Sequence, residues 1–201
     1  MQRTIPSLII ALHILLTAFQ TGHTQSRDVS RHLGSEGPVL AFASVGADTI
    51  LASLASGQLF RSCDMAWTWY LLSRTDARDA LTCFLHTEAG LFAGTRSGAI
   101  VRSTDAGMSW LTVHRFPTEA IVSSLVRDGD AILGLSRDGS ITRGSEHGSR
   151  WNTLAVVPSI RSTDALRLND TLIVACGDGD GLLISDDGGA TWNAPTDPPL
   201  S

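Results

Sequence analysis

The sequence predicts an all-β protein, a β-propeller built from four four-stranded antiparallel blades. Four tryptophans recur every 41 residues in a chain of 201, at Trp69, Trp110, Trp151 and Trp192. Each closes a similar short phrase rich in Ser, Asp and Gly. Between the phrases lie apolar runs of strand length, and no run after residue 38 keeps a helical period. A repeat of about 40 residues that carries four strands is typical of propeller blades.

The strands are predicted by runs that align when the sequence is shifted by one period. The run 57–61 aligns with 98–102 and 139–143, and 180–184 completes this column more loosely. Each run is apolar or β-branched and is bounded by turn-forming residues. In the third unit we expect strands at 121–126, 131–136, 140–144 and 150–157. The blades are then expected at residues 39–74, 80–115, 121–157 and 162–194, within a propeller that covers 39–194.

The N-terminus has the pattern of a secretion signal. Arg3 provides a positive start, and the apolar run 8–19 is too short for a membrane helix but suits the core of a signal peptide. We expect a signal peptide at 1–24, a linker at 25–38 and a Pro-rich tail at 195–201. The mature protein is therefore expected to be exported, to the periplasm or the extracellular space, with no membrane span.

The phrase that ends at each tryptophan predicts a tight turn, which we call the Trp turn. Ser and Asp side chains can hydrogen-bond the backbone of such a turn, Gly allows positive φ, and the Trp ring fixes the hairpin to its sheet. This role is structural. The residues assigned to it are Ser62, Asp64, Trp69, Ser103, Asp105, Gly107, Trp110, Gly148, Trp151, Ser185, Asp187, Gly189 and Trp192.

These turns resemble the Asp-box, or bacterial neuraminidase repeat, whose motif is Ser-x-Asp-x-Gly-x-Thr/Ser-Trp. The turns at 103–110 and 185–192 match every defined position. The first turn has Ala66 in place of Gly. The third has Gly144 in place of Ser, Glu146 in place of Asp and Arg150 before the Trp. The resemblance covers residues 39–194 and implies a propeller. It leaves function open, because the superfamily includes sialidases, other glycoside hydrolases, receptor ectodomains and photosystem assembly factors.

A catalytic site is not supported by the residues. Sialidases of this superfamily use a Tyr–Glu pair and three arginines, but the one tyrosine, Tyr70, follows a Trp turn, and the family's Arg-Ile-Pro signature is missing from the blades. Other glycosidases need two facing carboxylates, whereas the acids in register fall in separate blades. The six histidines show no zinc spacing, and residues 178–188 lack the spacing of an EF-hand. We expect no metal, no cofactor and no catalytic residues.

A column of arginines carries the binding prediction. The links between blades and the turns between second and third strands share one rim of a propeller, opposite the Trp turns. Five arginines fall there and could bind an anionic group: Arg74, Arg96, Arg115, Arg137 and Arg161. Acids fall on the same rim, at Asp76, Asp79, Glu119, Asp138 and Asp178.

The sequence therefore favours an exported, non-catalytic module that binds or scaffolds a protein or glycan ligand. The alternative is a sialidase-like glycoside hydrolase or a truncated fragment of one. The net charge of −5 argues against a nucleic-acid partner. Each blade is contiguous in sequence, so no terminal strand closes the ring. Four blades are then expected to form a tightly packed ring, an open arc, or a homodimer that pairs two chains into eight blades through open blade faces. A sequence cut short at 195–199 is a further alternative.

Overall fold

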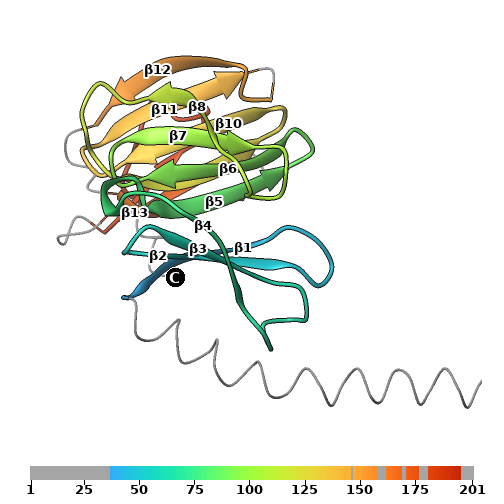
Figure 1. Cartoon of the computed structure of the whole chain (residues 1–201). Helices are drawn as coiled ribbons and strands as arrows, with labels where there is room; N and C mark the ends of the chain where they lie inside the picture. Colours follow the sequence, from blue (N-terminus) through green and yellow to red (C-terminus); the bar gives the residue numbers. More distant parts are fainter. Residues whose placement is uncertain (1–36, 146, 158–161, 169–170, 177–180, 196–201) are drawn as a thin grey trace, which may run out of the picture.

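The computed structural model describes residues 37–145, 147–157, 162–168, 171–176 and 181–195, which form four antiparallel sheets (Figure 1). The first three sheets have four strands each, in sequence order. The strands are β1 (Val39–Ser44), β2 (Ile50–Leu54), β3 (Gln58–Ser62) and β4 (Tyr70–Arg74); β5 (Leu81–Thr87), β6 (Gly90–Thr95), β7 (Ala99–Ser103) and β8 (Leu111–Arg115); and β9 (Val122–Asp128), β10 (Ala131–Ser136), β11 (Ser140–Ser145) and β12 (Arg150–Val156). The expected all-β propeller is confirmed, and the strands of the third blade lie within two residues of their predicted bounds.

The fourth sheet differs from the expectation. It contains β13 (Ser162–Leu168), β14 (Thr171–Cys176) and β15 (Gly181–Ser185), and the expected fourth strand is reduced to one bridge between Ile184 and Asn193. The two residues exchange backbone hydrogen bonds of 2.8 and 2.9 Å. Pro195 follows shortly after and has no N–H to donate, which disfavours a longer ladder.

The core lies between blades. β1 packs against β5, β5 against β9, and β9 against β13, so each blade covers one face of the next (Figure 1). Leu59, Ile100 and Ile141 are 41 residues apart and at most 2% exposed. Each belongs to an apolar cluster shared with the following blade. Within the described ranges, β1 and β13 make no comparable contact, so the blades follow one another without a packed junction between the last and the first.

The Trp turns are held by their own Ser and Asp side chains. In the second turn the Ser103 hydroxyl donates to Asp105 at 2.7 Å and accepts from the Gly107 N–H at 2.8 Å. Asp105 also accepts from the backbone and the hydroxyl of Ser109, at 2.9 and 2.5 Å. The first and fourth turns repeat these bonds, from Ser62 and Asp64 and from Ser185 and Asp187.

The tryptophans of three turns also hydrogen-bond the turn backbone. The indole N–H of Trp69 donates to Ala66 O at 3.1 Å, that of Trp151 to Gly148 O at 2.9 Å, and that of Trp192 to Gly189 O at 3.1 Å. The rings pack against the apolar clusters of their blades. Such contacts are what a structural role requires.

Helical structure in the described residues is limited to one short 3-10 turn, Ala77–Asp79 (η1), in the link between the first two blades. None of the helical residues there forms a segment long and apolar enough to cross a membrane.

Cys63 is an exposed free thiol, and Cys83 is a free, partly buried thiol on β5. Burial raises the pKa of Cys83 to about 12. The side chain of Cys176 lies outside the described residues.

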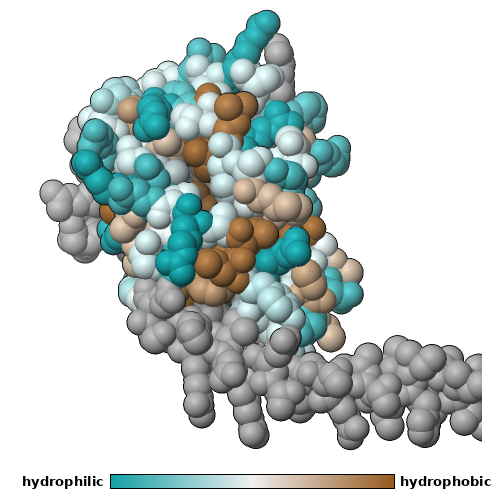
Figure 2. Space-filling view, viewed as in Figure 1, coloured by the Kyte–Doolittle hydropathy of each residue, from teal (hydrophilic) through white to brown (hydrophobic). Residues whose placement is uncertain are grey.

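The visible surface mixes polar and apolar residues. Figure 2 shows apolar side chains gathered between polar ones, most densely toward the blade of β1–β4 and its border with the second blade. Several large apolar side chains are exposed on the outermost strands, among them Leu71, Leu111 and Val156. Others are exposed on strands of the first and last blades, among them Phe42 on β1 and Leu182 on β15.

Candidate functional site

Four of the five predicted rim arginines lie in the described residues, and all four are exposed. Arg74 and Arg115 end the outer strands β4 and β8, while Arg96 and Arg137 begin the turns that follow β6 and β10. Arg161 lies outside the described residues. No ion pair of these four arginines is found within the described part of the chain.

Backbone hydrogen bonds hold the rim turns against the links between blades. The Arg96 N–H donates to Ala80 O at 3.1 Å, and the Arg137 N–H donates to Ile121 O at 2.9 Å. The hydroxyl of Ser97 donates to Asp79 at 2.5 Å, and that of Thr118 donates to Asp138. Each of these two rim turns is therefore fixed to the link that leads into its own blade.

An open hollow of about 440 Å³ lies on this rim between the first and second links. Its lining combines two arginines, a carboxylate, a hydroxyl and two apolar side chains: Arg78, Arg96, Glu119, Ser97, Ala77 and Ile121. We call it the rim hollow. Of the predicted arginines only Arg96 lines it. Arg78 was missed, because it belongs to η1 and has no counterpart at the same position of the repeat.

The rim is close to balanced in charge. Arg78 pairs with Glu119 at 3.6 Å, and both side chains are more than four-fifths exposed, so the pair is weak. Partial burial acts to raise the pKa of Asp138, but hydrogen bonds from Ser136, Thr118 and Ser140 outweigh it, and the pKa is lowered. The described rim thus sets the four predicted arginines and Arg78 against Asp76, Asp79, Glu119 and Asp138. A ligand that carries both an anionic group and hydrogen-bond donors fits this pattern better than a polyanion does.

The Trp turns occupy the opposite side and use their carboxylates internally. Hydrogen bonds from Ser109 and Ser103 lower the pKa of Asp105 to about 2, and those from Thr191 and Ser185 lower that of Asp187 to about 2. A carboxyl group with such a low pKa stays ionised and is a poor general acid. Tyr70 is half-exposed on the outer strand β4. The described residues hold no group of three or more His, Cys, Asp or Glu placed to bind a metal ion.

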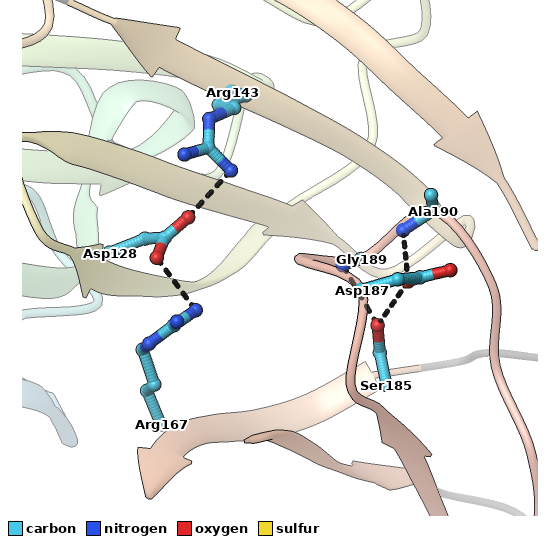
Figure 3. A network of polar contacts seen from close by, with 7 residues as sticks. All are labelled: Asp128, Arg143, Arg167, Ser185, Asp187, Gly189 and Ala190. Atoms are coloured by element: carbon cyan, nitrogen blue, oxygen red, sulfur yellow. Dashed lines mark hydrogen bonds and ion pairs between the residues drawn. The ribbon is translucent and has the colours of Figure 1, made fainter. Parts of the chain in front are cut away.

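A second charged cluster joins the third and fourth blades (Figure 3). Asp128 at the end of β9 accepts from Arg143 of β11 at 2.5 Å and from Arg167 of β13 at 2.7 Å. The Asp128 side chain is only 10% exposed. Figure 3 places this cluster close to the Trp turn of Ser185 and Asp187. The sequence gives one hint of it, since Arg143 is in register with Arg61 and Arg102, but the partner acid comes from a different strand.

Comparison with known proteins identifies the fold alone. No protein-family model matches the chain, and no curated protein matches it. Among solved structures, the computationally designed Ika4 protein aligns with a TM-score of 0.57 and 13% identity, over 76% of this chain and 92% of Ika4. The designed Ika8 protein gives the same TM-score and identity over 76% of this chain and 47% of Ika8. YCF48 from Cyanidioschyzon merolae aligns with a TM-score of 0.59 and 14% identity, over 79% of this chain and 56% of YCF48. The chain therefore spans about half the length of Ika8 and YCF48.

Proposed function

We propose that the protein is an exported, non-catalytic binding module of the Asp-box propeller superfamily and that its ligand docks at the rim hollow. The observation that carries the proposal is Arg96, an exposed arginine without an ion pair in the described residues that borders an open hollow. The β-propeller fold itself suggests a binding or scaffolding role, because its rims present many loops on a rigid body.

The chemistry of the hollow defines the ligand class. Arg96 and Arg78 offer guanidinium donors, which bind a carboxylate or sulfate in a bidentate manner. Glu119 and Ser97 add acceptors for ligand hydroxyl or amide groups, and Ile121 and Ala77 add apolar contact. A protein segment or a glycan that carries an acidic group has all three features.

The test is a binding screen followed by matched variants. Immobilised acidic glycans, sulfated glycans and acidic peptides are presented to the purified chain, and affinities are measured for the ligands that bind. We expect Arg96→Ala to weaken binding about tenfold, because a charge-assisted hydrogen bond is lost. Arg127→Ala is the control, since Arg127 is half-exposed at the opposite end of its blade, paired with Glu88 at 3.7 Å.

Equal weakening by Arg96→Ala and Arg127→Ala would mean nonspecific charge attraction and would refute the rim hollow as the site. Hydrolysis of a fluorogenic sialoside or of a bound glycan would refute the non-catalytic assignment.

The Asp-box assignment is supported by the Ser–Asp hydrogen bonds in three of the four turns. Export is tested separately, by expressing the whole sequence in a secreting host and determining the N-terminus of the product. A product that keeps residues 1–24 would refute it.

A further inference from the structure

We propose that two copies of the chain join head to tail, the last blade of each on the first blade of the other, to complete a single eight-bladed ring. This proposal concerns assembly and does not rest on the rim hollow. It starts from the two blade faces at the ends of the array. We call the face that a blade turns toward the following blade its forward face, and the opposite one its rear face.

The forward face of the fourth blade repeats a buried pattern but is uncovered. Leu59, Ile100 and Ile141 occupy the same position in the first three blades and are buried against the blade that follows. Leu182 lies one period after Ile141, yet it is 47% exposed. The position therefore keeps an apolar residue of the same size although no described blade covers it.

Two further leucines belong to the same face. Ala165 and Leu183 pack against the third blade, so they lie on the rear face. Side chains alternate along a strand, which places their neighbours Leu166 and Leu182 on the forward face. Leu168, two residues beyond Leu166, lies on that face as well. Leu166 is 55% exposed and Leu168 is 60% exposed.

The rear face of the first blade has the matching half of a junction. In the second blade Phe84 and Trp110 form a tilted ring pair, with centroids 6.3 Å apart, that packs in one cluster with Leu59 of the blade before it. In the first blade Phe42 and Trp69 form the same pair, with centroids 6.4 Å apart. No described blade precedes it; Phe42 is 61% exposed, whereas Trp69 is 6% exposed.

The two ends are thus complementary to each other in the way that every internal junction is. Leu182 would meet the exposed Phe42 ring beside Trp69, at the place where Leu59 meets the Phe84–Trp110 pair. Within the described residues, β1 and β13 of one chain do not pack together. A second copy supplies both missing partners at once. Head-to-tail contacts that close after two copies give a symmetric ring with two identical junctions.

Burial of exposed leucines and of Phe42 at two junctions removes apolar surface from water, which is the main favourable contribution to stable association.

The experiment measures the solution mass of the purified chain by light scattering at micromolar concentration. Leu182→Glu alters only the forward face and Phe42→Glu alters only the rear face. Leu111→Glu is the control, because Leu111 is 70% exposed on β8, outside both end faces. All three side chains are exposed in the single chain, so the variants are expected to fold, and cooperative unfolding is checked for each.

We expect twice the mass of one chain for the unmodified protein and for Leu111→Glu. Leu182→Glu and Phe42→Glu should each give the mass of one chain while they keep cooperative unfolding. A single-chain mass for the unmodified protein would overturn the proposal. Loss of the double mass in only one of the two end-face variants would also overturn it, because that result means that like faces pair.

Discussion

At the scale of single residues, the four Trp turns share one backbone conformation, which some of their residues adopt more easily than others. The fourth and fifth positions of each turn have positive φ. The fifth position is Gly107, Gly148 or Gly189 in three turns but Ala66 in the first, where φ is +72°. A Cβ in this region meets the neighbouring carbonyl oxygen, so Ala66 is strained.

Replacement of Ala66 should relieve this strain. We expect Ala66→Gly to raise the free energy of unfolding by about 0.5–1 kcal/mol, because the release of strain exceeds the entropy that Gly adds to the unfolded chain. The matched reverse change is Gly107→Ala, at φ +91°, where a Cβ would lie 3.0 Å from Leu51 Cδ1. It should lower the free energy of unfolding by about 1–3 kcal/mol. Urea unfolding of both variants measures the difference, and a destabilised Ala66→Gly would contradict the strain argument.

The turn carboxylates predict a pH dependence. Hydrogen bonds from Ser109 hold the pKa of Asp105 at about 2, below its unfolded value of about 4. A lowered folded pKa gives stability that is present above about pH 4 and is lost as the pH falls toward 2. Ser109→Ala removes the hydroxyl donor at 2.5 Å, so the pKa of Asp105 should rise and the loss of stability in this window should shrink.

A carboxyl NMR titration measures this pKa in the intact chain. Asp187 has an equivalent turn with Thr191 as donor and serves as the internal control. Its pKa should stay at about 2 in the Ser109→Ala variant. An unchanged pKa for Asp105 would show that the backbone N–H donors and the Ser103 hydroxyl set its value without the Ser109 hydroxyl.

At the scale of strands and blades, the sequence predicted what is local. Short apolar runs bounded by turn residues predicted the third blade to within two residues, because a hairpin is specified by its own strands and turns. The missing last strand was not foreseen, because the Trp turn before it matches its counterparts, but Pro195 in the segment after Trp192 disfavours the strand. The contacts of Asp128 were not foreseen either. These contacts join β9, β11 and β13. The distances between the charged groups depend on how one blade is rotated against the next.

The Asp128 cluster should hold the fourth blade to the third. Asp128→Asn keeps the shape of the side chain but removes the charge that faces Arg143 and Arg167. We expect the free energy of unfolding to fall by about 1–3 kcal/mol, because two charge-assisted bonds at a largely buried carboxylate weaken. Hydrogen exchange should become faster in β13 before it does so in β5.

Glu119→Gln provides the matched control for this change. It removes the acid of an ion pair in which both side chains are more than four-fifths exposed, so stability should change by less than about 0.5 kcal/mol. An equal loss of stability in the two variants would mean that Asp128 does not act through its burial between blades.

At the scale of the whole molecule, the sequence predicted the rim but not its shape. The period of 41 residues was enough to place Arg96 and Arg137 at equivalent turns, and both are exposed there. The hollow itself depends on η1, a break in the repeat that brings Arg78 to Glu119. Closure of the ring was also left open by the sequence, because the same blade can form rings of different size according to small changes in the packing angle between neighbours.

Head-to-tail pairing makes the stability of the whole molecule depend on concentration. A partner that binds only the folded chain stabilises it by mass action, so the thermal midpoint should rise as the protein concentration is raised. Leu182→Glu should unfold with a midpoint that is independent of concentration, whereas Leu111→Glu should follow the unmodified chain. Differential scanning calorimetry over a wide range of concentrations measures all three. A concentration-independent midpoint for the unmodified chain would leave each four-blade array to fold on its own, with the leucines of β13 and β15 exposed to water.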